Sequence, residues 1–496
     1  MTLVARSTLL FALTLSAGAI SVEAQSAKLP ELRPLTKVLS RSTEDLGSIA
    51  TAVPLPGGRV LVNDILQRRV VMFDSSLTQV SVVADTTMAT GNAYGARGGG
   101  LIGFRGDSAL FIDPVSLSMM TVNGTGELTT VRAVPRAQEV NAFTGAQGRP
   151  GFDDKGRLVY RGVPRPRFGG RNARPAVGNF VMPELPDSAP IVRLDMSART
   201  IDTASAVKFN RPDVKVSQGN DGRISVQTRT NPFPMIDEWA LLSDGTIAVV
   251  RGHDFHIERI HPDGRVTSSP KLPFEWQRLD EETKAFILDS ARTALEKQRE
   301  EAQRLITTNG AGAFFSSGGA EMIMGGGMGG GMGGGMGGGA MIVMGGGPGG
   351  GGGGPPQRGG QGGGGGQGGG ERGRGGQGGG QGGGQGGGQG GGPGGAGGFQ
   401  LPAVQLVDPA DIPDYRPPFT PNAAIGDLDG NLWVRTTAVA GDLGPIYYVI
   451  DAKDQIIDRV QLPPGRILSG FGPGGTLYLA VRDTAGKTFL ERVSVK

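Results

Sequence analysis

An all-β protein made of small stacked sheets is predicted by a unit that recurs about six times along this chain. Each copy has a short apolar strand, a glycine-centred turn, a second apolar strand and a further turn, usually after an Asp. A sheet of this size cannot bury both of its faces alone, so the recurrence implies that neighbouring sheets stack. Six units of four strands predict a six-bladed β-propeller. The first turns of the units lie at residues 56–58, 105–107, 154–156, 243–245, 429–431 and 473–475.

The strand that follows each first turn is apolar on consecutive residues rather than on alternate ones. This pattern indicates a strand that neighbouring sheets cover on both faces. The six strands are residues 60–62, 110–112, 158–160, 246–250, 432–434 and 477–481.

The two chain ends are expected to complete one blade together. The last unit, residues 466–495, has room for only three strands, whereas residues 35–40 form a strand-like segment ahead of the first unit. We therefore expect residues 35–40 to close the ring. A seventh blade would need a hidden unit between residues 207 and 234, where residues 224–230 supply one strand and not four.

Residues 1–24 are predicted to be a signal peptide. Arg6 precedes the uncharged stretch 7–22, which is too short for a comfortable membrane span, and Val22 and Ala24 fit cleavage before Gln25. We expect export to the periplasm or the medium, with no membrane span. The chain has no cysteine, and its net charge of +3 is too mild to indicate nucleic acid as a partner. A monomer is expected.

The foldable part of the chain is interrupted once by a long insertion. Residues 25–273 are predicted to form blades one to four, and residues 400–496 blades five and six. Between them, residues 274–308 predict a helix, with Asp280 as its N-cap and apolar residues that include Phe286, Ile287, Ala291 and Leu295 at helical spacing. Residues 309–399 are nearly all Gly, Met, Gln and Pro, so we expect a disordered spacer there.

Several motifs resemble known propeller sequences. Residues 62–64 with 69–74 resemble an NHL-type propeller repeat. Residues 412–419, 429–434, 448–451 and 462–465 resemble a group of exported bacterial six-bladed propeller proteins, the NHL and gluconolactonase-like propellers. The resemblance implies the fold and export, and it transfers no catalytic residue to this chain.

The long connections are predicted to leave from one face of the propeller. Strands alternate in direction within a blade, so the loops after second and fourth strands share a face. Residues 161–190, 209–234 and 274–421 all belong to this class of loop. Loops on a rigid scaffold commonly carry function, so this face is where a binding site is expected.

A charged residue follows the second strand of every blade on this face. Two explanations stay open: the charges pair between blades, or the arginines form an anion-binding mouth. The loop 161–190 adds four arginines and no acid among them. We predict a binding or scaffold module, without a cofactor, that recognises a partner protein or an anionic ligand on this face. The candidate residues are Asp64, Asp113, Arg161, Arg251, Arg435 and Arg482, with Arg165, Arg167, Arg171 and Arg174 in the loop.

The alternative is a metal-dependent hydrolase of lactonase type with calcium or zinc at the central channel. Asn141, Asp237, Glu238 and Asn422 stand at the entries to innermost strands and are residue types that hard cations accept. Gluconolactonase-like propellers hold a divalent metal with Glu, Asn and Asp, as the resemblance implies. The three histidines, 253, 256 and 261, fall in one hairpin and do not predict a triad or a metal site. The sequence thus favours binding over catalysis.

Overall fold

The computed structural model describes residues 29–145, 147–164, 186–211, 213–218, 224–309, 405–438 and 444–495, which belong to one compact unit of the chain. They form a six-bladed β-propeller with an appended helix and hairpin, so the predicted fold class is confirmed. Three expectations lie outside the described residues: the signal peptide at 1–24, the loop arginines at 165, 167, 171 and 174, and the tract beyond residue 309.

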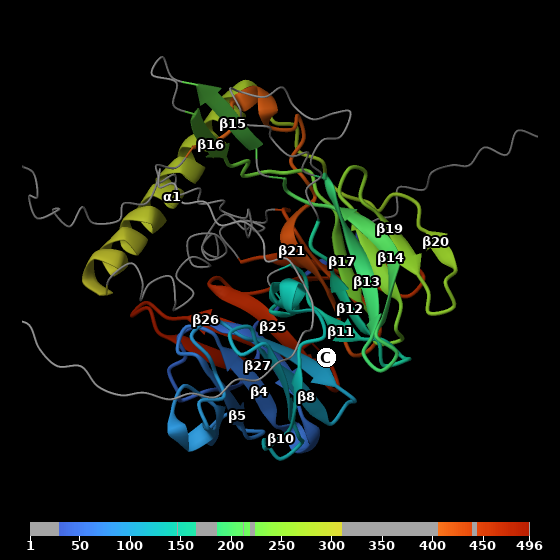
Figure 1. Ribbon diagram of the computed structural model, residues 1–496. Coiled ribbons are helices and arrows are strands. Elements are labelled where there is room, and N and C mark those ends of the chain that lie inside the picture. The colour runs from blue at the N-terminus through green and yellow to red at the C-terminus, as the bar shows by residue number, and fades with distance from the viewer. Residues whose placement is uncertain are drawn as a thin grey trace, which may run out of the picture. The chain divides into compact units, whose positions relative to one another are not determined.

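The first three blades are antiparallel sheets whose strands pair in chain order (Figure 1). They consist of β3 (Ile49–Pro54), β4 (Val60–Asp64), β5 (Arg69–Phe73) and β6 (Val80–Ala84); β7 (Gly100–Phe104), β8 (Ser108–Asp113), β9 (Ser118–Val122) and β10 (Leu128–Ala133); β11 (Gly151–Phe152), β12 (Leu158–Arg161), β13 (Ser188–Asp195) and β14 (Thr200–Lys208).

The last three blades continue the same order, and each matches one of the predicted units. They consist of β17 (Glu238–Leu241), β18 (Ile247–Arg251), β19 (His256–Ile260) and β20 (Val266–Ser268); β21 (Phe419–Gly426), β22 (Leu432–Thr436), β23 (Ile446–Ile450) and β24 (Ile456–Gln461); β25 (Arg466–Gly472), β26 (Thr476–Arg482) and β27 (Thr488–Ser494). Short 3-10 helices lie between strands at η1 (Pro56–Gly58), η2 (Met88–Thr90), η3 (Ala137–Phe143) and η4 (Pro409–Asp411).

The N-terminal segment closes the ring. β2 (Val38–Arg41) pairs antiparallel with β27 and supplies the fourth strand of blade six, which confirms the expected closing strand. A further strand, β1 (Leu32–Pro34), pairs parallel with β24 and adds a fifth strand to blade five. Nothing in the sequence predicts β1, because it is three residues long and ends in a proline, which only an edge strand tolerates.

The core consists of six apolar clusters, one between each pair of neighbouring blades. β4 shows why its residues are apolar in succession. Val60 and Val62 pack toward blade six beside Tyr478 and Leu490, whereas Leu61 packs toward blade two beside Phe111. A fully buried Val or Leu side chain contributes roughly 1.5–3 kcal/mol, so every blade depends on both of its neighbours.

An appended lobe stands outside the six sheets. It consists of α1 (Glu281–Asn309), η4 and the hairpin of β15 (Asp213–Gln218) and β16 (Ile224–Arg229), which is a two-stranded sheet and not a seventh blade. A small core of Phe233, Leu279, Ile287, Leu288, Val407 and Ile412 holds the lobe together. Arg229 adds an ion pair to Asp408 at 2.8 Å.

The helix begins as predicted: the Asp280 carboxylate accepts the Thr283 N–H at 2.8 Å and caps its first turn. Ile287, Ala291 and Leu295 are buried as expected. Phe286 corrects the predicted apolar stripe, because it is 65% exposed and faces solvent. No helix among the described residues is both long and apolar enough to cross a membrane.

The long connections leave from one face, which we name the insertion face. The connections β12 to β13, β14 to β17 and β20 to β21 all follow second or fourth strands of antiparallel blades. Segments from the last two connections meet in the appended lobe, where Thr230 and Leu406 form a parallel bridge. The connection β10 to β11, which contains η3, leaves from the same face.

Candidate functional site

A buried carboxyl lies at the inner end of the insertion face. Glu238 begins β17, is 5% exposed, and accepts the backbone N–H of Asn422 in β21 at 2.9 Å. Burial raises the pKa of Glu238 to about 7, and the positive charges of Arg161 and Arg435 act in the opposite direction. We call these four residues the central cluster.

The two arginines of the central cluster have different partners. Arg161 ends β12 with its guanidinium 5.8 Å from the centre of the Phe209 ring. Its Nε is buried without a hydrogen-bond partner among the described residues, and burial lowers its pKa against the opposing charge of Glu238. Arg435 in β22 donates to the Thr420 hydroxyl and the Pro421 carbonyl, both at 3.3 Å.

Arg149 crosses the middle of the ring beside this cluster. It precedes β11 in blade three and donates to the carbonyls of Leu468 and Ser469, in blade six, at 2.8 and 3.0 Å. In a ring of six, these two blades face each other. Burial lowers the pKa of Arg149 to about 10, which still leaves the guanidinium charged at neutral pH.

The segment before β11 also bonds to blades four and five. The Gly148 N–H donates to the Asn422 side chain at 3.1 Å, and Trp239 Nε1 donates to the Gln147 carbonyl at 3.3 Å. Gly148 has a φ of 97°, and a Cβ there would lie 2.4 Å from Trp239 Nε1. Only glycine fits at position 148, because a side chain there would collide with the Trp239 ring. The middle of the ring is therefore filled by the chain at this level.

The other four charged residues that follow second strands have partners of their own. Arg251 pairs with Asp237 at 2.7 Å and with Glu258, within its own blade. Arg482 is exposed and donates to the Gly486 carbonyl in its own turn at 3.1 Å. Asp64 and Asp113 are buried and accept N–H groups of adjoining turns. The structure thus brings Arg161 and Arg435 together and leaves the other four apart.

The four predicted metal ligands divide in the same way. Glu238 and Asn422 meet, whereas Asp237 is bonded to Arg251 and to the Lys208 and Gly252 N–H groups. The Asn141 side chain is exposed in η3. Among the described residues, no group of three or more His, Cys, Asp or Glu side chains is placed to hold a metal ion.

The central cluster does not suit a divalent cation. Calcium takes six to eight oxygen ligands, and this cluster offers one carboxylate beside two guanidinium groups whose charge repels a cation. The histidines do not add a site: His256 pairs with Asp254 at 2.6 Å, while His261 contacts Thr267 at 3.0 Å.

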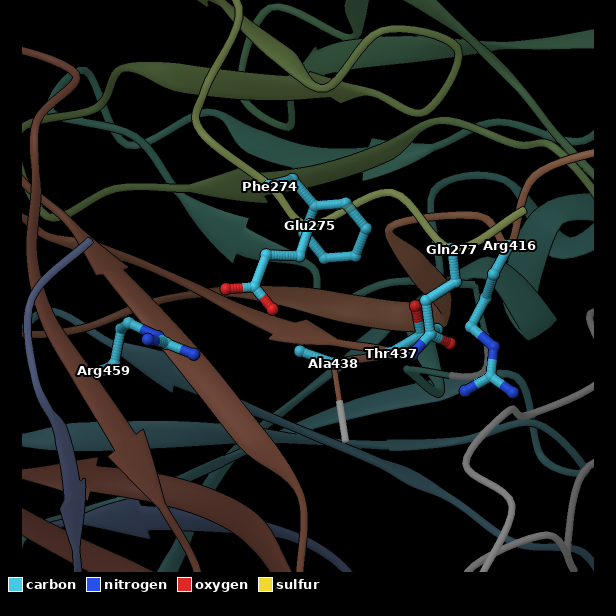
Figure 2. Close-up of a pocket in the computed structure, with 7 residues that line it drawn as sticks. All are labelled: Phe274, Glu275, Gln277, Arg416, Thr437, Ala438 and Arg459. Atoms are coloured by element: carbon cyan, nitrogen blue, oxygen red, sulfur yellow. The ribbon is translucent and has the colours of Figure 1, made fainter. Parts of the chain in front are cut away.

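A second charged site lies farther out on the insertion face, and we name it the rim pocket (Figure 2). Its walls come from the segment between β20 and α1, the segment before β21, the loop after β22, and β24. Its cavity volume is about 40 Å³. Figure 2 shows Arg459 and Arg416 at opposite ends of the pocket. The lining residues are Phe274, Glu275, Gln277, Arg416, Thr437, Ala438 and Arg459.

Arg416 has no acidic partner in the described part of the chain. Its guanidinium lies 5.5 Å from the centre of the Phe233 ring, and its Nε is buried without a hydrogen-bond partner there. Burial is the cause that lowers its pKa, and no neighbouring carboxylate opposes that shift. This arginine is therefore held in a partly dry setting with its charge uncompensated.

Arg459 is only partly satisfied. One Nη donates to the Pro30 carbonyl at 3.3 Å, and the guanidinium lies 5.4 Å from the centre of the Tyr448 ring. Its Nε has no partner among the described residues. Glu275 is exposed between the two arginines and forms an ion pair with neither. Sequence reasoning missed all three residues, because they come from segments far apart in the chain and match no charge pattern.

No known family model and no curated protein matches this chain. Among solved structures it is similar to a gluconolactonase from Xanthomonas campestris, with 11% identity, 93% of this chain and 98% of that chain covered, and a TM-score of 0.33. It is also similar to regucalcin, a calcium-binding protein from Agrobacterium tumefaciens, with 11% identity, coverages of 94% and 97%, and a TM-score of 0.35. We therefore infer the function from the residues of the site and not from these similarities.

Proposed function

We propose that this protein is a propeller-based binding module that takes an anionic group of a ligand or partner protein in the rim pocket. The observation that supports this most is the guanidinium of Arg416, which is partly buried and has, among the described residues, neither an acidic partner nor a hydrogen bond to its Nε. A desolvated charge without a counter-charge is unfavourable, and a bound anion would remove that cost.

Arginine suits this role because its planar fork donates two parallel hydrogen bonds to a carboxylate or phosphate. Arg459 adds a second guanidinium at the far end of the same pocket, and its buried Nε has no hydrogen-bond partner among the described residues. A volume of about 40 Å³ is far below the roughly 300 Å³ of sites that enclose a whole small molecule. The pocket therefore holds an end group, and the rest of the ligand or partner lies on the insertion face.

Export is part of the proposal. The apolar segment 7–22 after Arg6 supports a protein that works outside the cytoplasm, and a monomer is sufficient for the binding described. The partner would then be an envelope protein or a solute of that compartment.

The proposal is tested by thermal unfolding of the purified protein with acetate or sulfate, at an ionic strength held constant with chloride. An anion that binds only the native state, at a concentration of ten times its Kd, stabilises the fold by about 1.4 kcal/mol. The shift in Tm should appear in wild type and vanish in Arg416→Met. Arg482→Met is the matched control, since Arg482 is an exposed arginine bonded within its own turn. Equal shifts in all three proteins would overturn the proposal.

The metal-dependent lactonase remains the competing function, because Glu238 and Asn422 do come together. Stoichiometric calcium or zinc in the purified protein, together with lactone hydrolysis that Glu238→Gln removes, would favour it. The two arginines beside Glu238 lead us to expect neither result.

A further inference from the structure

The rim pocket contains a negative charge as well as two positive ones. Arg416 and Arg459 stand at its ends, and the Glu275 carboxylate lies between them, turned toward the Arg459 side in the view of Figure 2. Glu275 makes no ion pair with a described residue. Burial raises the pKa of Tyr448, and the negative charge of Glu275 adds to that shift. Glu275 is therefore available to act on whatever enters the pocket.

We infer that Glu275 makes the rim pocket selective for a monoanionic carboxylate over a dianionic oxyanion such as sulfate or a phosphate ester. This inference rests on the proposed function and names its ligand class. Two guanidinium groups and one carboxylate give the pocket a formal charge of +1, which one negative charge balances. A dianion overcompensates it and places its second charge against Glu275.

The shape of the pocket agrees with this selection. Gln277 supplies an uncharged amide, Thr437 already donates its hydroxyl to the Pro417 carbonyl at 2.5 Å, and Phe274 and Ala438 are apolar. Apart from the two guanidinium groups, the lining side chains thus include no further positive charge for a dianion. The pocket therefore takes the carboxylate end of an organic acid or of a peptide chain.

The experiment compares acetate with sulfate, at equal ionic strength, in four forms of the protein: wild type, Glu275→Gln, Glu282→Gln and Arg416→Met. Glu282→Gln removes the same charge from an exposed position on α1 outside the pocket lining. Dissociation constants come from calorimetry or from the concentration dependence of Tm.

We expect wild type to bind acetate more tightly than sulfate. In Glu275→Gln the affinity for sulfate should rise by about tenfold, and that for acetate by a smaller factor, because the lost repulsion scales with ligand charge. Glu282→Gln should leave both constants within about twofold, as expected for a screened charge at a distance.

The inference and the proposed function fail in different ways. If neither anion binds through Arg416, both are overturned. If both anions bind and Arg416→Met abolishes their binding, but Glu275→Gln leaves the ratio of their constants unchanged, the inference alone is overturned. If wild type binds sulfate as tightly as acetate through Arg416, the inference alone is again overturned.

Discussion

The central cluster and the rim pocket both place two arginines beside one glutamate, yet the charges are used differently. In the central cluster Arg435 donates to blade five, Glu238 accepts the Asn422 N–H, and Arg149 alongside bonds to two carbonyls of blade six. In the rim pocket Arg416 forms no ion pair with a described acid, and Glu275, which lines the same pocket, is exposed and likewise without an ion pair among the described residues.

The difference teaches that residue type alone does not identify a binding site in a propeller. A charge whose hydrogen bonds end on its own chain stabilises the fold, whereas one that is desolvated and left without a partner is available to a ligand. Substitutions in the two sites should therefore separate into effects on stability and effects on binding.

The largest expected effect is at Arg149. Arg149→Met removes two buried hydrogen bonds and leaves the Leu468 and Ser469 carbonyls unsatisfied, so the free energy of unfolding should fall by about 3 kcal/mol. Urea denaturation measures this loss, and the Tm shift with anions should persist. A loss below about 1 kcal/mol would contradict the structural role given to this residue.

Glu238 should give a similar effect that depends on pH. Its folded-state pKa of about 7 lies above the ordinary value of 4.5, so the folded protein binds the proton of Glu238 more tightly than the unfolded chain does. The stability that this proton contributes to folding is fully present below pH 4.5 and is lost as the pH rises through 7. Relative to Glu238→Gln, wild type should lose about 3 kcal/mol between pH 4.5 and pH 8. Parallel stability profiles of the two proteins from urea titrations would rule out a buried titrating carboxyl.

Substitution of Arg251 distinguishes the two explanations for the charged residues that follow the second strands. Arg251→Ala breaks half-buried ion pairs with Asp237 and Glu258 and should cost about 1 kcal/mol of stability, with no change in anion binding. Denaturation and the anion-dependent Tm measure the two effects. An anion response that disappears in this variant would favour the anion-binding mouth, the second of the two explanations that the sequence leaves open.

The smallest effect, and the one of opposite sign, is at Arg416. Arg416→Met removes an uncompensated charge from a partly dry site, so stability without ligand should stay equal or rise by about 0.5 kcal/mol while anion binding is lost. Comparing urea midpoints of wild type and variant tests this. Destabilisation by more than about 1 kcal/mol would show that Arg416 supports the fold as Arg149 does.

The sequence predicts the scaffold well because, apart from β1 and β2, the strands of each blade follow one another along the chain. The turn at residues 56–58 and the apolar run that follows it give β3 and β4 without any distant information, and the same holds for the other five blades. Ring closure was predictable because the last unit was one strand short. β1 was not, since its pairing with β24 is set by register between distant segments.

The site was predictable only in part. The alternation of strands predicts which connections share the insertion face, and it brings Glu238 and Arg161 to the same end of their blades. It does not reveal that Arg149 bonds across the ring or that Arg251 is satisfied within its blade. Glu275 and Arg416 lie on either side of the long inserted tract, so only the folded chain shows that they line one pocket.

The pairing of β1 with β24 and of β2 with β27 makes the molecule divisible in an unusual way. A cut within residues 310–400 would give one fragment with four complete blades and two free strands, and another whose last two sheets lack their outer members. Each fragment holds what the other needs. The two fragments should therefore reassociate without a covalent link, because β1 and β2 of the first fragment pair with β24 and β27 of the second.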